Sequence, residues 1–325
     1  MKKLSILAYA CLLMILIATG CADNNKDNAQ LPEEPTNGAI SHDTQSDAGM
    51  GALAEIVEEL DSPQPHVNDN EFIFDQINGT LISYSGLGGE VIIPAQIESV
   101  DVIHIGESVF NGRDDISSIF IEDGVQTIGK SAFGDSLIAS ITVPKSVKSI
   151  DEWAFWRTGI ASMEMPEGVE VISEGLFMMC GSLSSIIIPQ SAASIGGVAF
   201  SLCSSLPEII IPSNVKTIGY GAFRHCENLV SVTIEEGLES IEERAFEYCT
   251  SLSSIVIPAS VIDIGNEVFA GSTIKEIVFM GSRPAFTDTF EGASALENIY
   301  YSKNAAGWPG EPVSIGVSWI TPKPY

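Results

Sequence analysis

Residues 208–230 read EIIIPSNVKTIGYGAFRHCENLV, and the chain repeats this pattern along most of its length. A phenylalanine recurs every 22 or 23 residues, and an isoleucine precedes each of these phenylalanines by five residues. Chance does not keep eight such pairs in register, so each repeat is one structural unit that contributes to a shared core. The eight phenylalanines are Phe110, Phe133, Phe155, Phe177, Phe200, Phe223, Phe246 and Phe269.

Short β-branched runs separate the phenylalanines and often end in proline, as in LSSIIIP, LPEIIIP and LSSIVIP. A period in the low twenties is typical of leucine-rich solenoids, in which each turn supplies one strand and stacking buries the common core. We therefore predict an α/β-type leucine-rich repeat solenoid with one short strand per 22–23 residue turn. Glu122 and Glu235 replace the proline in two repeats, so the repeat pattern does not determine the local shape of those two coils.

The repeat unit L-x-x-I-x-I-P-x-x-V-x-x-I-G-x-x-A-F-x-x-C resembles the BspA-like leucine-rich repeat family of bacterial surface proteins. The resemblance covers about residues 71–310 and includes a closing segment, SRPAFTDTFEGASALENIYYSKNAAGWPG, that is similar to the family's C-terminal turn. It implies a non-catalytic role in adhesion to host or neighbouring-cell components.

Ahead of the repeats, residues 71–94 contain two alternating apolar runs around Asn78-Gly79. Asn-Gly between such runs is the strongest short-range signal for a β-hairpin, and it favours a type I′ turn. We predict an N-terminal hairpin cap.

The N-terminus, MKKLSILAYACLLMILIATGC, places Lys2 and Lys3 ahead of an uncharged run and ends in small residues before a cysteine. This is the form of a secretory signal. Its ending, ATGC, resembles the lipobox of bacterial lipoproteins, which implies that Cys21 carries the lipid anchor and begins the mature chain. Ala18 stands where that family prefers Leu, so cleavage by an ordinary signal peptidase is the alternative.

Four segments follow from these observations: a signal peptide (1–20), a lipid-anchored acidic flexible tether (21–67), the solenoid with its caps (68–310) and a C-terminal tail (311–325). Residues 22–67 are rich in Asp, Asn, Pro, Gln and Ser and have too little apolar surface to offset the entropy of ordering. Residues 51–60 have the spacing of an amphipathic helix, which packs on the following domain or binds a partner.

The formal net charge of −28 argues against a nucleic-acid partner, because Lys and Arg carry the affinity for phosphates. The sequence contains no H-E-x-x-H, G-x-S-x-G, P-loop or EF-hand pattern, and only His104 and His225 fall in the repeats. We therefore expect no catalytic residue, no metal ligand and no cofactor, and we expect membrane contact through the lipid anchor alone.

His225 stands beside Cys226, which raises the question of a reactive pair or half of a metal site. Cysteines follow the repeat phenylalanine by three residues in four consecutive repeats, so stacking would set the four thiols in a line about 14 Å long. They cannot converge on one ion, because a zinc site needs every sulfur about 2.3 Å from the metal. We expect buried free thiols and a His225 ring stacked between Leu202 and Tyr248. The four cysteines are Cys180, Cys203, Cys226 and Cys249.

Alternation along the strands separates core-facing residues from outward residues on the expected concave face. The outward residues are Ser, Thr and aliphatic with few charges, which indicates either an interaction surface or simply the β-propensity of these residues. We call the central part of this face the strip and predict that it binds the ligand. The strip comprises Ser185, Ile187, Glu208, Ile210, Ser231, Thr233, Ser254 and Val256.

One repeat carries Trp153 and Trp156 where other repeats mostly have Ser, Gly, Asn, Arg or Glu, and Met178 follows in the adjoining turn. These three residues form a secondary candidate binding patch, because large aromatic residues dominate interface energetics. The alternative is that the two indoles cover a gap left by repeats that are one residue short.

The sequence as a whole favours a non-catalytic, membrane-anchored lipoprotein at the bacterial cell surface that recognises an extended extracellular protein or glycan through its repeats. Two alternatives are open. One is an extracellular enzyme that acts on a polymer, although the outward serines have no histidine near them. The other is a structural envelope spacer.

Replacing Cys21 with Ser is expected to release the protein from the membrane or to stall its processing, because serine cannot accept the thioether-linked lipid. Membrane fractionation and the mass of the mature N-terminus measure the outcome. A variant that stays membrane-bound and is processed at the wild-type rate would show that the lipoprotein assignment is wrong.

Overall fold

The computed structural model describes residues 69–286, 288–308, 313–314 and 319–325. The signal sequence with Cys21, the tether and its segment 51–60 lie outside the described residues, as do the predicted boundaries at residues 20, 67 and 310. The description begins with a short 3₁₀ turn, η1 (Asp69–Glu71).

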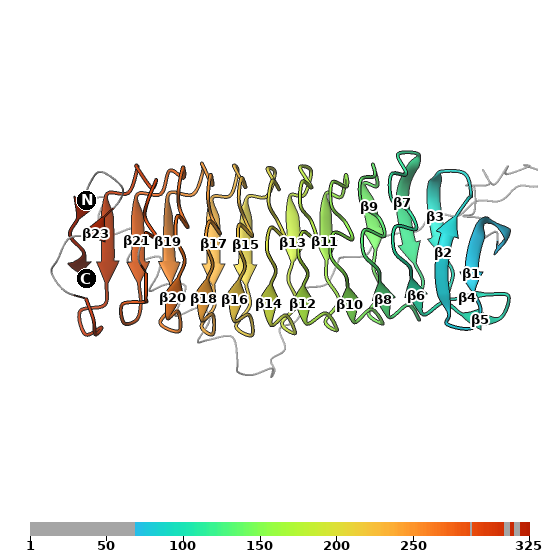
Figure 1. Cartoon of the computed structure of the whole chain (residues 1–325), viewed down its shortest axis with the longest axis horizontal. Helices are drawn as coiled ribbons and strands as arrows, with labels where there is room; N and C mark the ends of the chain where they lie inside the picture. Colours follow the sequence, from blue (N-terminus) through green and yellow to red (C-terminus); the bar gives the residue numbers. More distant parts are fainter. Residues whose placement is uncertain (1–68, 287, 309–312, 315–318) are drawn as a thin grey trace, which may run out of the picture. The chain divides into compact units, whose positions relative to one another are not determined.

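Each repeat forms one coil, and successive coils lie side by side (Figure 1). One wall of the stack is a column of parallel strands in which equivalent residues pair, for example Ile210 with Thr233. This long-strand column consists of β3 (Gly89–Ile93), β7 (Ile116–Ile121), β9 (Ser140–Thr142), β11 (Ser162–Glu164), β13 (Ser185–Ile187), β15 (Glu208–Ile211), β17 (Ser231–Ile234), β19 (Ser254–Ile257), β21 (Glu276–Phe279) and β22 (Asn298–Tyr301).

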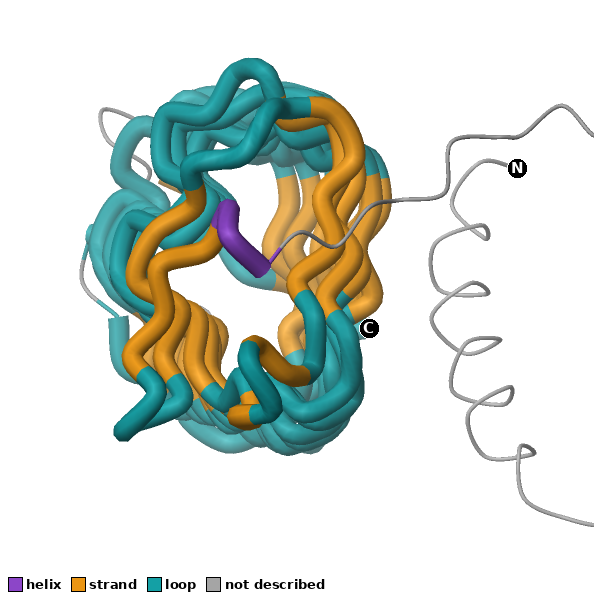
Figure 2. Tube along the Cα trace, turned by 90° about the vertical axis from the view of Figure 1, so that its right-hand side faces the viewer, coloured by secondary structure: helices purple, strands orange, loops and turns teal. Residues whose placement is uncertain are grey.

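A second column of two-residue strands forms the opposite wall, as the view along the coils shows (Figure 2). The predicted strand of each turn is therefore confirmed, and most coils add a second, shorter strand. This short-strand column consists of β6 (His104–Ile105), β8 (Thr127–Ile128), β10 (Ser149–Ile150), β12 (Val171–Ile172), β14 (Ser194–Ile195), β16 (Thr217–Ile218), β18 (Ser240–Ile241) and β20 (Asp263–Ile264).

Irregular elements stand at the two ends of the stack. The predicted N-terminal hairpin is confirmed as β1 (Phe72–Asp75) and β2 (Thr80–Tyr84), and β2 continues the short-strand column by pairing with β6. A second hairpin, β4 (Gln96–Ile97) and β5 (Val100–Asp101), lengthens the first corner. At the other end β23 (Val313–Ser314) pairs with β24 (Trp319–Ile320), and β25 (Lys323–Pro324) adds to β22.

The core of the stack contains a continuous row of phenylalanine rings among buried aliphatic side chains. All eight repeat phenylalanines are fully buried. From Phe110 to Phe269 each ring stacks on the next with centroids 5.3–5.9 Å apart, and Phe290 extends the row. The five-residue Ile–Phe spacing therefore identified the core correctly.

The helical part of an α/β-type class is not present in the described residues, and turns join the strand walls instead. On this turn side the backbone N–H groups of residues such as Phe223 donate to the next coil, here to the Ala245 carbonyl, rather than to a residue of their own segment. Two positions in most turns also have a positive φ, for example Arg244 (59°) and Tyr248 (58°) in one turn. An α-helix requires the opposite sign of φ and bonds within the segment, so none forms.

Glu122 and Glu235, which replace the repeat proline, preserve the coil rather than distort it. The Glu122 carboxylate accepts a hydrogen bond from the Ala95 N–H (2.8 Å), and the Glu235 carboxylate accepts one from the Ser213 N–H (2.9 Å). The two donors, the Ala95 and Ser213 N–H groups, occupy equivalent positions, each in the coil that precedes the glutamate. The two glutamates thus satisfy backbone donors that lie at a corner of the neighbouring coil.

The turn of the N-terminal hairpin differs from the predicted type I′ turn. The loop spans residues 76–79, and of Asn78 and Gly79 only Gly79 has a positive φ (63°), whereas type I′ requires both. Asp75 explains the longer loop, because its carboxylate accepts bonds from the Ile77 N–H (2.9 Å) and the Asn78 amide (2.6 Å). These bonds, with one from the Asn78 N–H, lower the pKa of Asp75.

Replacing Phe223 with Ala is expected to lower the free energy of unfolding by about 3–5 kcal/mol, since it opens a cavity between two stacked rings. Phe120→Ala is the matched control, because Phe120 is 47% exposed on the outer face of β7 and should lose far less. Urea unfolding of both variants measures the difference. Equal losses would contradict the assignment of the phenylalanine row as the core.

Candidate functional site

The predicted strip lies on the outward face of β13, β15, β17 and β19. The residue between the two outward positions of each strand is buried, from Ile209 at 2% exposure to Ile186 and Val232 at 9%, whereas Ile234 at the end of β17 is half-buried. Ile187 and Ile210, on adjacent coils, expose 57% and 58% of their surface. The predicted inward and outward sides of these strands are therefore confirmed. Ser185, Glu208 and Ser231 are exposed, and Thr233, Ser254 and Val256 are half-buried.

The charged side chains on this face are all acidic. From β7 to β21 the outward residues of the long strands include Glu164, Glu208 and Glu276 but no Lys, Arg or His. Within the described residues, neither Glu164 nor Glu208 has an ion-pair or hydrogen-bond partner for its carboxylate. Chemically, the face offers two exposed isoleucines, a row of hydroxyls, and carboxylates without a partner among the described residues.

The secondary patch lies on the turn side of the stack, away from the strip. Trp153 packs against Gly175 of the following coil, and Trp156 packs against Gly134 of the preceding coil, so closely that a Cβ at either glycine would collide with the ring. Both indoles and Met178 are half-buried. These contacts fit the interpretation in which the rings cover the shortened repeats, and ligand binding by this patch stays a prediction.

His225 and Cys226 do not face each other. The His225 ring stacks on Tyr248 of the next coil, with centroids 4.6 Å apart and an interplanar angle of 13°, which confirms that half of the predicted arrangement. Its contact with Leu202 stays a prediction. The Cys226 thiol is fully buried and donates to the Phe200 carbonyl at 3.1 Å. His225 is half-buried and stacked on a ring, whereas the Cys226 thiol bonds a carbonyl in the core, and no hydrogen bond joins the two side chains among the described residues.

The other cysteines repeat this arrangement, and all four are free and buried. Each thiol donates to the carbonyl of the repeat phenylalanine in the preceding coil, at 3.0–3.2 Å. Burial raises the pKa of each thiol, in Cys226 from 9.0 to about 12. Thiols of this kind are poor nucleophiles because the reactive thiolate is disfavoured.

Hydroxyl residues take the place of cysteine in three shorter coils. Ser136, Thr158 and Ser272 also follow the repeat phenylalanine by three residues, are buried, and donate to its carbonyl at 2.6–2.9 Å. A position that serine and threonine fill equally well does not depend on sulfur chemistry. The column therefore supplies small hydrogen-bonding side chains to the core.

An ion-pair network on the turn side was not foreseen. Arg224 contacts Glu247 (2.5 Å), whose side chain is only 9% exposed, and Arg244 contacts Glu267 (2.6 Å). Each pair joins equivalent positions in adjacent coils. The signal in the sequence was the 23-residue spacing between each Arg and its Glu, which equals the repeat length.

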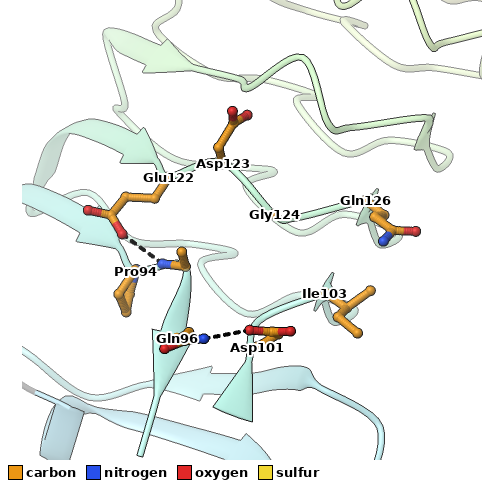
Figure 3. A pocket seen from close by; sticks show the side chains of 9 residues that line it. Pro94, Gln96, Asp101, Ile103, Glu122, Asp123, Gly124 and Gln126 are labelled. Carbon is orange, nitrogen blue, oxygen red and sulfur yellow. Dashed lines mark hydrogen bonds between the residues drawn. The ribbon is translucent and has the colours of Figure 1, made fainter. Parts of the chain in front are cut away.

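A pocket of about 550 Å³ opens where the β4–β5 hairpin stands beside the next corner (Figure 3). Its acidic residues are partly engaged by the fold, because Glu122 binds the Ala95 N–H and Asp101 accepts a bond from the Gln96 amide (2.7 Å). The lining residues are Pro94, Ala95, Gln96, Asp101, Ile103, Glu122, Asp123, Gly124 and Gln126.

Within the described ranges, no group of three or more His, Cys, Asp or Glu side chains is arranged to hold a metal ion. No helix in those ranges has the length and apolar composition needed to cross a membrane.

The stacked coils define a leucine-rich repeat solenoid, and comparison with known families agrees. The chain belongs to the BspA type leucine rich repeat family, whose model matches six copies over residues 90–196 and 170–297. The resemblance read from the repeat unit is thereby confirmed. No curated protein matches the chain.

Solved structures support the same fold. The chain is similar to a leucine-rich repeat protein of T. pallidum, with 25% sequence identity and a TM-score of 0.51 over 63% of this chain and 88% of that one. It is also similar to a leucine-rich repeat protein of Bacteroides ovatus ATCC 8483, with 25% identity and a TM-score of 0.55 over 71% and 69% of the two chains.

Replacing Cys226 with Ala is expected to lower the free energy of unfolding by about 1–2 kcal/mol at most, through lost packing and one lost hydrogen bond. Ligand binding should not change. Thiol titration at pH 8 should detect the repeat cysteines only after unfolding, because the folded Cys226 has a pKa of about 12.

The raised pKa of Cys226 also makes the free energy of unfolding depend on pH. The ordinary thiol pKa of 9.0 applies to the unfolded chain, and the folded value is about 12. The contribution of this thiol to the free energy of unfolding is therefore complete below pH 9 and declines as the pH rises toward 12. Full thiol reactivity in the native protein, or stoichiometric zinc, would contradict this account.

Proposed function

We propose that this protein is a non-catalytic recognition or adhesion module that is held at the bacterial cell surface and binds an extended protein or glycan through the strip. The observation that carries the proposal is the composition of this face. In a chain with a net charge of −28, the long strands expose Ile187 and Ile210 side by side and carry no basic residue outward. Exposed apolar surface of this kind marks interaction sites.

The repeat geometry suits an extended ligand. Stacked strands lie about 4.8 Å apart, so the eight strands from β7 to β21 form a continuous face roughly 35 Å long. Each strand offers only its few outward side chains, so affinity arises from many weak contacts. Many copies on one cell then raise the effective affinity.

The surface location rests on two supports. Membership of the BspA type family is one, and the signal-like N-terminus that ends in Cys21 is the other. In this proposal the lipid on Cys21 anchors the chain, and the acidic tether extends the solenoid from the membrane. Membrane contact occurs through the anchor alone.

The double variant Ile187→Lys/Ile210→Lys tests the strip. Binding of the purified chain to a panel of extracellular-matrix proteins and glycans is expected to fall at least tenfold, because two charges replace the apolar contacts. Urea unfolding should change little, since both side chains point outward. Surface plasmon resonance on the panel, with assays for product release alongside, makes the measurement.

The matched control is Val171→Lys/Ile262→Lys, which adds the same charge at exposed aliphatic residues elsewhere on the coils (50% and 66% exposed). It should bind like the wild type. If the strip variant also binds like the wild type, the proposed site is wrong and the Trp153–Trp156 flank is tested next. Turnover of a polymer would favour the enzyme alternative, and an empty panel would favour the spacer.

A further inference from the structure

The strip is not uniform along its length, and its one exposed apolar pair is flanked by carboxylates. Glu164 pairs in register with Ile187 across β11 and β13. The repeat then places Ile210 on the next coil, so these three side chains form one column with steps of about 4.8 Å. Glu208 lies two residues before Ile210 in β15, on the same outward side.

Both carboxylates are available to a partner. Glu164 and Glu208 are exposed, and among the described residues neither has an ion pair or hydrogen bond. Elsewhere on the coils, carboxylates often serve the fold itself: Glu235 binds the Ser213 N–H, and Glu267 pairs with Arg244. The charge beside the isoleucines is therefore uncompensated within this face.

We infer that the partner of the strip is an extended polypeptide whose aliphatic side chains cover Ile187 and Ile210 and whose Lys or Arg side chains pair with Glu164 and Glu208. This inference rests on the proposed function, because it specifies the occupant of the same face. An extended chain points alternate side chains to one side about every 6.7 Å, so it can place aliphatic and basic groups over the adjacent coils.

A neutral glycan fits this part of the face less well. The hydroxyls of a sugar ring would lose water over two isoleucines that offer no hydrogen bond in return, and such unpaired polar groups are costly to bury. A basic polypeptide also gains from attraction to the strongly acidic chain during approach.

The probe is the fluorescently labelled octapeptide Ac-(Lys-Lys-Val-Val)2-amide, the Lys-Val peptide, which in an extended conformation presents alternating Lys and Val on each face. Fluorescence anisotropy measures its binding to the purified full chain at 150 mM salt. It is expected to bind at least tenfold more tightly than the charge-reversed Ac-(Glu-Glu-Val-Val)2-amide and the apolar-deficient Ac-(Lys-Lys-Ser-Ser)2-amide. A Lys-Val peptide that binds no more tightly than either control peptide would overturn the inference.

Two variants locate the site. Glu164→Gln/Glu208→Gln should weaken binding of the Lys-Val peptide about fivefold to tenfold, since each exposed pair adds a factor of a few. Ile187→Ser/Ile210→Ser should weaken it at least tenfold. The matched control, Glu170→Gln/Glu174→Gln, removes the same charge from exposed residues on other sides of a nearby coil and should change binding less than twofold. If the two glutamine variants lose the same amount of affinity for the Lys-Val peptide, the inference is overturned, because the peptide would then respond to the net charge of the chain and not to this site.

Failure of this inference is distinguishable from failure of the proposed function. If Ile187→Lys/Ile210→Lys loses panel binding while the Lys-Val peptide shows no preference, the strip remains the binding face and only the partner chemistry is wrong. Preferential binding of a linear neutral hexasaccharide in the same assay would likewise overturn the polypeptide partner and identify a glycan instead. If that Lys variant retains panel binding, the proposed function itself is wrong.

Discussion

Each coil of this solenoid closes around a phenylalanine ring that stacks on the ring of the next coil. A single coil of about twenty residues cannot bury such a ring by itself, so the fold exists only as a stack. The rings lie 5.3 Å apart in the central coils, close to the roughly 4.8 Å between hydrogen-bonded strands, so ring stacking and strand pairing hold the coils at nearly the same separation. The buried thiol column and the outward register of the strip repeat at that separation.

Because the core is repetitive, binding specificity must come from residues that break the repetition. On the long-strand face from β7 to β21 most coils present Ser or Thr, and the departures are Phe120, Glu164, Ile187, Glu208, Ile210, Val256, Glu276 and Val278. Glu164, Ile187, Glu208 and Ile210 lie on three adjacent coils. Changes at outward positions leave the core unaltered, so such a solenoid acquires a binding surface without losing stability.

The sequence predicted the core and the outward face well because both depend on periodicity alone. The 22–23 residue spacing of residues such as Phe200 and the alternation around Ile187 can be read from the sequence alone. The second strand of most coils was missed because two residues, as in Thr217–Ile218, are too short to show alternation. The absence of a helix on the turn side was missed because Met179 and Tyr248 occupy left-handed positions without the usual signal of glycine.

Contacts between coils were the hardest to foresee. The role of Glu235 depends on a backbone N–H in the preceding coil, and that of Trp156 depends on the absence of a side chain at Gly134. Neither neighbour is close in sequence, so only the stacked structure reveals them. The candidate site was predictable as a face, but the pairing of its unbalanced charges with exposed isoleucines required the exposures of individual residues.

The hydrogen bonds of the buried thiols give the stack a direction. Each thiol, such as that of Cys226, donates backward to a carbonyl of the preceding coil, while turn-side N–H groups, such as that of Phe223, donate forward to the coil that follows. A stack divided between two such coils would leave turn-side N–H donors open on its N-terminal piece and thiol donors open on its C-terminal piece. The two ends of the stack therefore offer different bonding groups to a neighbouring coil.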